Sequence, residues 1–349
     1  MISDKKQEIR TRPCPDCYIC GIKGQPLYQD LQDRLFGAPG RWDLKKCPNP
    51  ECGLVWMDPM PIEEDIGKAY ETYYTHDDST YITNTWLRRV YRLVKEGYLS
   101  YKYGYFSTPT SAWKKVLGML LYFHPGRRAD LDFSVMYLPA KPNGNLLEIG
   151  SGSGQMLKFL QDLGWHVEGV DFDAAAVENA KAKGVQVNLD TLESQKYPKD
   201  YFDVIIMSHL IEHVHDPLQL LCESYRILKP YGRVVIVTPN INSWGHEIYK
   251  KNWRGLEPPR HLRVFTSSSL RNLVGKVGFK KTRISTTIRD ATGIFIASRF
   301  IQYQGSYVMG SHQPRTVRIW ARGMQLAEWM FLKANPYLGE EIALIAKKE

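Results

Sequence analysis

Long hydrophobic runs are missing from this sequence. The longest, Val116 to Phe123, is far shorter than the roughly 20 apolar residues that a helix needs to cross a bilayer. The first residues, Met1 to Lys6, also lack the apolar core of a secretory signal peptide. Because neither feature is present, we expect no transmembrane segment, a soluble protein and a cytoplasmic location.

Internal repeats and low-complexity tracts are absent as well. Of the 349 residues, 43% are hydrophobic and 24% are charged, which is typical of a folded protein and excludes a disordered or collagen-like chain. The length suffices for one large domain and a smaller module. Acidic residues are fewer than basic ones: the sequence has 37 Asp and Glu and 46 Lys and Arg. The resulting net charge of +9 is compatible with an anionic partner.

Cysteine is nearly absent from the second part of the sequence, where only Cys222 occurs. The other five cysteines lie within the first 52 residues. Disulfides are disfavoured in the cytosol, so the turns Cys17-Tyr-Ile-Cys20-Gly21 and Cys47-Pro-Asn-Pro-Glu-Cys52-Gly53 predict a zinc site. Each turn supplies two of the four thiolates that tetrahedral zinc needs, and the following glycine lets the backbone turn. We therefore predict a zinc-ribbon-like module at residues 1–60, whose metal ligands are Cys17, Cys20, Cys47 and Cys52.

Other interpretations of the cysteines stay open. Cys14-Pro-Asp-Cys17 is also a Cys-x-x-Cys turn, so five thiols compete for four metal positions. We favour Cys17 and Cys20 because Gly21 mirrors Gly53. The alternatives are reduced structural thiols and, less favoured because no βαβ pattern surrounds the turns, a redox pair.

Residues 61–140 are rich in aromatic and basic side chains at helical spacing and carry no catalytic motif. Between Tyr81 and Arg128, nine Lys and Arg face one acid, Glu96. We interpret this region as a helical, basic and aromatic linker or cap. Its charge indicates either a solvated helix face or a surface for an anionic substrate or membrane headgroups, and hence possible peripheral membrane contact.

From residue 141 onward, strands and helices alternate. We predict strands at 146–149, 166–170, 185–187, 202–207, 233–237 and 341–346, and helices at 155–164, 174–183 and 217–228. Short crossovers imply that neighbouring strands are parallel. The predicted fold class is therefore α/β, with a doubly wound sheet over residues 141–349.

The first of these strands ends in a glycine-rich loop, Glu148-Ile149-Gly150-Ser151-Gly152-Ser153-Gly154, and the second ends at Asp171. Dinucleotide-binding loops have the spacing G-x-G-x-x-G, which differs from the G-x-G-x-G found here. A carboxylate at Glu148 repels pyrophosphate and suits a cation. S-adenosylmethionine carries a sulfonium, an ammonium and a ribose whose hydroxyls Asp171 can accept, so the loop favours this cofactor over NAD.

These motifs resemble the class I S-adenosylmethionine-dependent methyltransferases over about residues 130–349. The resemblance rests on Glu148 to Gly154, Gly169-Val170-Asp171, Phe202 to Ile205, Leu210 to Val214 before Asp216-Pro217, and Arg226 to Pro230 before Gly232. More narrowly, Trp253-Arg254-Gly255-Leu256-Glu257-Pro258-Pro259-Arg260-His261-Leu262, behind the cysteine turns, is similar to a bacterial subgroup often associated with modification of cell-surface glycans or small molecules. The four residues between Cys47 and Cys52 depart from its pattern.

The resemblance implies a Rossmann-like, seven-stranded sheet whose last strand is antiparallel. It also implies that S-adenosylmethionine lies over the carboxyl ends of the first strands. Glu148 would support the loop, and Asp171 would bind the ribose. The remaining cofactor-binding residues would be Gly150, Gly152 and Gly154 along the methionine moiety, and Asp190, Thr191 and Leu192 beside the adenine.

Three residues are candidates for binding the methyl acceptor or removing its proton. His209 directly follows the fourth strand and is the candidate base that removes a hydroxyl proton. Arg260 and His261 lie in an insertion at 241–265, which in the resembling fold forms part of the acceptor pocket; alternatively they hold that loop together. We interpret Glu212 and His213 first as a structural pair, with metal binding as an outside possibility.

Basic residues also concentrate near the insertion. Between Lys250 and Arg289, eleven Lys and Arg face one acid, Glu257, which suits a phosphorylated, nucleotide-linked or acidic sugar. We expect a methyltransferase that acts on a small molecule or glycan precursor, most often at oxygen.

The alternative is an RNA methyltransferase in which the zinc module and the basic helices contact phosphates. Met207-Ser208-His209-Leu210 stands where a base-methylating enzyme has Asn-Pro-Pro-Tyr, which disfavours N-methylation of a base. A non-catalytic binding protein is a third possibility, and the intact glycine loop argues against it.

Overall fold

The structure is a computed structural model that describes residues 8–70, 86–106 and 112–349. The chain forms two compact units, each discontinuous in sequence. The first comprises Met1–Tyr73, His209–Tyr225 and Ile236–Glu349, and the second comprises Tyr74–Ser208 and Arg226–Val235. The division at residues 60 and 140 that the sequence suggests stays a prediction.

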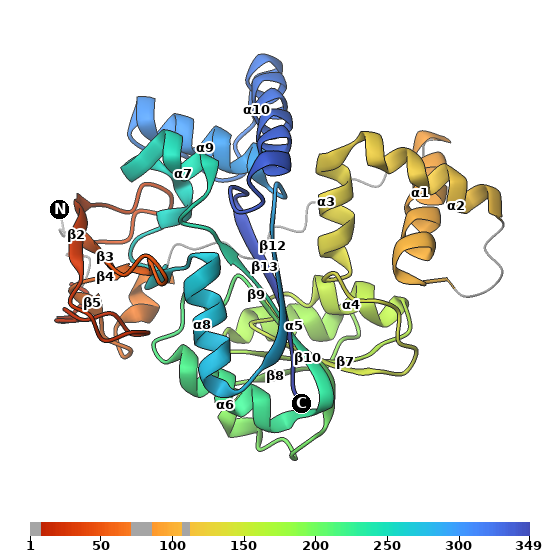
Figure 1. Cartoon of the computed structure of the whole chain (residues 1–349), viewed down its shortest axis with the longest axis horizontal. Helices are drawn as coiled ribbons and strands as arrows, with labels where there is room; N and C mark the ends of the chain where they lie inside the picture. The colour runs from red at the N-terminus through yellow and green to blue at the C-terminus, as the bar shows by residue number, and fades with distance from the viewer. Residues whose placement is uncertain (1–7, 71–85, 107–111) are drawn as a thin grey trace. The chain divides into compact units, whose positions relative to one another are not determined.

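A seven-stranded sheet has the order β12-β13-β10-β9-β6-β7-β8 (Figure 1). Its strands are β6 (Asn145–Ile149), β7 (His166–Asp171), β8 (Val187–Leu189), β9 (Phe202–Ser208), β10 (Leu228–Pro239), β12 (Lys280–Thr287) and β13 (Glu341–Lys347). Strand β6 pairs in parallel with β7 and β9, and β7 with β8, whereas β13 is antiparallel to β12. The expected Rossmann-like sheet with an antiparallel last strand is confirmed.

Strand β6 lies at the point where the strand order reverses, since its neighbours β7 and β9 lead to opposite edges of the sheet. In open α/β sheets, ligands bind beyond the carboxyl ends of the strands at such a point. Leu146 and Leu147 of β6 are fully buried, as expected for a central strand. The glycine loop that follows β6 is therefore held by a buried, central strand of the sheet.

The second unit also contains a group of helices. They are α1 (Trp86–Tyr103), α2 (Ala112–Met119), η2 (Leu120–Phe123), α3 (Pro125–Ser134), α4 (Gln155–Asp162), α5 (Ala174–Ala182) and η3 (Glu193–Gln195). Helices α1 and α2 lie side by side (Figure 1) and meet at two glycines. A Cβ on Gly97 would lie 1.9 Å from the carbonyl oxygen of Lys114, and one on Gly118 would lie 2.3 Å from the amide nitrogen of Tyr98. Only glycine permits this approach.

The predicted basic cap falls partly outside the described residues. Residues 71–85 and 107–111, and the side chain of Arg88, are not described. The helices that are described confirm the expectation of helical structure between residues 86 and 134.

The first unit contains the cysteine turns and a four-stranded antiparallel sheet of order β11-β4-β3-β2. These strands are β2 (Gln25–Leu31), β3 (Trp42–Lys46), β4 (Val55–Met57) and β11 (Arg263–Val264), and β1 (Thr11–Arg12) pairs separately with β5 (Met60–Pro61). Arg263 pairs with Trp56, and Val264 with Val55. The insertion at 241–265 thus contributes a strand to the N-terminal sheet, which the sequence did not predict.

The remaining helices belong wholly or largely to the first unit. They are η1 (Ile66–Tyr70), α6 (Pro217–Ile227), α7 (Trp244–Tyr249), η4 (Lys250–Asn252), η5 (Arg254–Leu256), α8 (Ser267–Val277), α9 (Ala291–Gln304) and α10 (Arg315–Ala334). Within the described ranges, none of the helices is both long and apolar enough to span a membrane.

Candidate functional site

The glycine loop after β6 adopts a backbone that favours glycine. Gly150, Gly152 and Gly154 have φ values of 72°, 51° and 68°, in the left-handed region where other residues are strained. A Cβ on Gly154 would approach that of Ala180 to 2.8 Å, whereas one on Gly152 would meet no heavy atom within 4 Å. The space beside Gly152 is therefore open, and a ligand can lie against the loop backbone.

Asp171, at the end of β7, fastens this loop. Its carboxylate accepts hydrogen bonds from the N–H of Gly152 (2.7 Å) and the N–H of Asp173 (2.9 Å). Its main-chain carbonyl accepts from the N–H of Asp190 (3.0 Å). One residue thus connects the predicted methionine-binding loop to the predicted adenine-binding segment.

Two polar atoms near the loop are buried without a partner. Among the described residues, neither Glu148 Oε2 nor Ser151 Oγ makes a hydrogen bond. Burial, together with the charge of Asp171, raises the pKa of Glu148 to about 8. Unsatisfied buried acceptors are costly unless a ligand donates to them. The loop therefore fits a ligand that carries an ammonium group and hydroxyls, as S-adenosylmethionine does.

The predicted adenine-binding residues line the turn after β8. Asp190 and Thr191 are exposed, whereas Leu192 is buried. Two exposed apolar side chains in the same unit were not predicted: Phe172, 67% exposed, directly follows Asp171, and Leu189, 50% exposed, directly precedes Asp190. Exposed apolar side chains beside a polar loop suit contact with an aromatic base. In the sequence, Phe172 and Leu189 could have been identified only by their positions next to Asp171 and Asp190.

His209, the candidate base, belongs to the other unit and has φ 50° directly after β9. Its Nδ1 lies 3.5 Å from Glu212 Oε1, and its Nε2 lies 3.1 Å from Glu341 Oε1. Arg289 Nη1 also donates to Glu341 Oε1, at 2.7 Å. Burial lowers the pKa of His209, but the two carboxylates outweigh this and raise it to about 9. The two carboxylates thus favour the charged imidazole, while Arg289 Nη1, 3.1 Å from His209 Nε2, favours the neutral one.

The Glu212-His213 pair lies close to His261, and ligand atoms of the three residues are within 4.8 Å of one another. Thr238 Oγ1 donates to Glu212 (2.9 Å), and His213 Nδ1 lies 2.9 Å from Tyr70 Oη. Burial and the proximity of His261 lower the pKa of His213 to about 4, so this ring is neutral. The contacts support a structural pair.

Arg260 and His261, predicted to face the acceptor, lie in the interior. The Arg260 side chain is fully buried, donates to Asp33 (2.9 Å) and Glu257 (3.0 Å), and stacks over Phe36. His261 Nδ1 donates to the carbonyl of Gly255 (2.8 Å). These contacts hold the insertion to the N-terminal segment, which was the alternative interpretation of the motif.

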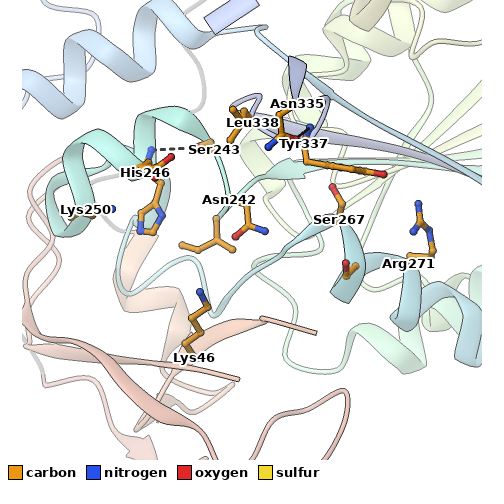
Figure 2. Close-up of a pocket in the computed structure, with 13 residues that line it drawn as sticks. Lys46, Asn242, Ser243, His246, Lys250, Ser267, Arg271, Asn335, Tyr337 and Leu338 are labelled. Atoms are coloured by element: carbon orange, nitrogen blue, oxygen red, sulfur yellow. Dashed lines mark hydrogen bonds between the residues drawn. The ribbon is translucent and has the colours of Figure 1, made fainter. Parts of the chain in front are cut away.

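The insertion borders a cavity, but Arg260 and His261 do not line it. A cavity of about 640 Å³ is formed by residues from four segments (Figure 2). It is lined by Lys46, Ile241, Asn242, Ser243, His246, Glu247, Lys250, Ser267, Ser268, Arg271, Asn335, Tyr337 and Leu338. The sequence placed an acceptor pocket in this part of the chain but identified none of these residues as its lining.

The four predicted zinc ligands come together. Cys17 Sγ lies 3.7 Å from Cys52 Sγ, Cys20 Sγ lies 3.3 Å from Cys47 Sγ, and all four sulfur atoms lie within 4.8 Å of one another. Gly21 and Gly53 have φ values of 70° and 62°, as the turns require. Cys14 is not part of the cluster. Four thiols at these separations fit a tetrahedral metal ion.

The known proteins to which this chain is similar include methyltransferases, the class that the glycine loop predicts. Residues 124–284 match the family model of a methyltransferase domain. The chain is 27% identical over 156 residues to a probable S-adenosylmethionine-dependent methyltransferase of Mycolicibacterium smegmatis, covering 43% of this chain and 55% of that protein. It is 28% identical to a ubiquinone biosynthesis O-methyltransferase of Bartonella tribocorum, covering 39% and 63%. The chain spans little more than half the length of the first curated relatives it matches.

A C-methyltransferase of ubiquinone and menaquinone biosynthesis from Geotalea daltonii is 32% identical, covering 30% of this chain and 49% of that protein. Among solved structures, a methyltransferase of Thermotoga maritima described as a possible histamine N-methyltransferase is 22% identical, with a TM-score of 0.43, covering 67% and 96%. Residues 124–284 are therefore similar to a methyltransferase domain, and the seven-stranded sheet is the Rossmann-like sheet expected for one.

Proposed function

We propose that this protein transfers a methyl group from S-adenosylmethionine to an oxygen atom of a small molecule or glycan precursor. The observation that carries this proposal is the glycine loop, which Asp171 fastens through the N–H of Gly152 and beside which Glu148 and Ser151 have buried atoms without partners. Relatives that are O-methyltransferases support oxygen, and the resemblance of the insertion motif supports a glycan precursor.

The residues of the cofactor loop have separate tasks. When bound, S-adenosylmethionine supplies a methyl group on a positively charged sulfur. Gly150, Gly152 and Gly154 would line the methionine part, Glu148 would accept a hydrogen bond from its ammonium, and Asp171 would accept from the ribose. Because this ligand is positively charged, its binding favours the ionised form of Glu148 and opposes the burial that raises the pKa.

His209 is the group we assign to the acceptor proton. An imidazole must be neutral to accept a proton, and two carboxylates keep His209 charged up to a pH of about 9. Proton removal by His209 would therefore become effective in weakly alkaline solution. At lower pH the ring is charged, both of its N–H groups face Glu212 and Glu341, and it cannot accept a proton.

The test is transfer of a labelled methyl group. Purified protein and methyl-labelled S-adenosylmethionine are added to an extract of a strain that lacks the gene, and the label is followed through nuclease, protease and glycan fractionation. We expect the label in a nuclease-resistant sugar or small-molecule fraction. The variant Asp171→Asn, which weakens the loop, is the control for enzyme-dependent label. Label that ribonuclease releases would overturn the proposed acceptor and make RNA the substrate.

We further propose that the cysteine cluster binds one structural zinc ion. The sulfur separations of 3.3 and 3.7 Å support it, since zinc–sulfur bonds of about 2.3 Å place ligands of one ion at similar distances. The ion would fix the two cysteine turns on strands β2 to β4. Its role would be structural because four thiolates leave no open position for a substrate.

We also propose peripheral membrane contact through α2 and η2. Trp113, Val116, Leu120 and Phe123 are exposed at spacings of three and four residues, so they form one apolar helix face, and Phe123 is 87% exposed. Lys115 of α2 and Arg127 of α3 are exposed in the same stretch of helices. An apolar face with basic neighbours is complementary to anionic lipid headgroups, which we take as the binding partner.

A further inference from the structure

The 640 Å³ cavity of the first unit lies where four chain segments meet (Figure 2). Lys46 ends strand β3, Asn242 follows strand β10, Ser267 begins helix α8, and Tyr337 precedes strand β13. The end of β10 and the start of the antiparallel β13 belong to the sheet edge at which ligands bind in this fold. The volume is that of a small-molecule site.

The cavity is basic. Lys46, Lys250 and Arg271 line it, and none of them forms an ion pair with a described residue. Glu247 is the one acid among the lining residues. Burial lowers the pKa of His246 to about 4, and repulsion by Lys250 and Lys46 adds to this effect. With the imidazole neutral, three exposed cations face one exposed carboxylate, and the lining has a net positive charge.

Ser267 adds a buried donor without a partner. The residue is 7% exposed, its hydroxyl makes no hydrogen bond within the described part of the chain, and it lines the cavity. Figure 2 shows the hydroxyl pointing into the cavity, with the Arg271 side chain on the same helix. An unsatisfied buried hydroxyl is costly, so a ligand that hydrogen-bonds to it is favoured.

The N-terminus of helix α8 adds to the attraction of an anion at Ser267. Thr266 caps the helix by accepting a hydrogen bond from the N–H of Ser269 (2.9 Å), so the first-turn N–H groups of Ser267 and Ser268 remain at the helix end. Such groups, and the positive end of the helix dipole, favour an anion. Arg271 lies one turn after Ser267, on the same side of the helix.

We propose that this cavity binds a phosphate group carried by the methyl acceptor, through the Ser267 hydroxyl, the start of α8 and the Arg271 side chain, while Lys46 and Lys250 add positive charge at other sides of the cavity. The acceptor class is therefore a phosphorylated or nucleoside-diphosphate-linked compound. Arginine and lysine donate to phosphate oxygens, while Asn242 and Tyr337 offer polar and aromatic contacts to the rest of such a molecule. The inference rests on the proposed methyltransferase function, whose acceptor it describes.

The test is isothermal titration of the full chain with inorganic phosphate, pyrophosphate and uridine diphosphate. We expect binding to the wild type, at least a tenfold loss in Arg271→Gln, and a smaller loss in Lys250→Gln. Arg283→Gln is the matched control, because it removes the same charge from an exposed position on β12 outside the cavity. Ser267→Ala should weaken binding several-fold, and circular dichroism should show that each variant is folded.

The three probes identify the source of the phosphate. Uridine diphosphate that binds tighter than pyrophosphate indicates a nucleotide-linked acceptor, whereas equal affinities indicate a phosphorylated one. If no probe binds the wild type, or if Arg271→Gln binds like Arg283→Gln, the inference is overturned. The affinity for S-adenosylmethionine, measured separately, should be equal in all variants. If the wild type does not bind S-adenosylmethionine, the proposed function is contradicted, but the result of the phosphate titration still stands.

Discussion

The hydroxyl of Thr266 donates a hydrogen bond of 2.6 Å to the main-chain carbonyl of Cys52. The same side chain caps helix α8 at the basic cavity. A single residue therefore connects the second cysteine turn to the start of the helix that we assign to phosphate. Metal in the cysteine cluster should for this reason support anion binding at a site that contains no metal ligand.

Metal content tests this connection. Cys52→Ser should lose the zinc, while Cys14→Ser should retain about one ion per chain because Cys14 lies outside the cluster. Cys52→Ser should also lower the melting temperature and weaken pyrophosphate binding, since the turn that supports Thr266 loses its anchor. Elemental analysis, a thermal scan and the titration measure the three effects. Full zinc occupancy in Cys52→Ser would remove this residue from the ligand set.

Cofactor affinity should depend strongly on Asp171. Asp171→Asn replaces a carboxylate oxygen that accepts from loop N–H groups and that we assign to the ribose. Hydrogen bonds to charged groups contribute about 1.5–3 kcal/mol, so the dissociation constant of S-adenosylmethionine should rise roughly 10- to 100-fold. Asp190→Asn changes an exposed carboxylate nearby and should have a much smaller effect. Equal losses in the two variants would contradict the assigned role of Asp171.

The cofactor loop could be predicted from the sequence because its determinants are local. Gly150, Gly152 and Gly154 follow a strand within five residues, and Asp171 ends the next strand, so alternation of strands and helices is enough to bring them together. The paired cysteine turns are equally local, and their four thiols meet as the spacing predicted.

The acceptor side could not be predicted in this way. Arg260 looked like a substrate residue among many bases, but Asp33, distant in sequence, neutralises it in the interior. Lys46, Ser267 and Tyr337 come from segments that no local pattern connects. Charge counts show how many cations a segment has, but only the tertiary structure shows which of them lack a partner.

Arg260 should consequently matter for stability. Arg260→Ala leaves Asp33 and Glu257 as buried carboxylates without their cation, and breaking a buried pair typically costs about 3–5 kcal/mol. We expect a marked fall in the melting temperature and a loss of cofactor and phosphate binding together. Arg254→Ala, whose partner Asp290 is exposed, is the comparison and should be mild. A stable Arg260→Ala variant with an isolated defect in phosphate binding would restore the acceptor role.

Glu148 should make stability depend on pH. Its pKa is raised to about 8 in the folded protein, whereas an unfolded glutamate ionises near its ordinary value of 4.5. Between these values the folded state binds more protons than the unfolded state, so the contribution of Glu148 to stability falls as the pH rises from 4.5 to 8. Glu148→Gln does not ionise, and its melting temperature relative to the wild type should increase over this range. A difference that is constant with pH would exclude the assigned titration.

The role of His209 predicts a pH profile for methyl transfer. Because the pKa of His209 is about 9, the fraction of neutral imidazole, and with it kcat/KM, should increase from pH 7 to about pH 9 and then level off. His209→Asn should lose this rise and reduce the rate by about 10²- to 10⁴-fold, the usual contribution of a general base. If His209→Asn keeps the wild-type profile, the ring is not the base.

Membrane contact is tested by flotation of the full chain with anionic vesicles that contain phosphatidylglycerol. We expect the wild type to float, and more so at low salt, because both the apolar face of α2 and η2 and the neighbouring bases contribute. Phe123→Glu should remain in the soluble fraction. Tyr231→Glu adds the same charge at a residue that is also largely exposed but lies outside that face, so it should float like the wild type. Equal flotation of the two variants would show that α2 and η2 are not the contact surface, since only one substitution places a carboxylate among the apolar side chains that we assign to the lipid.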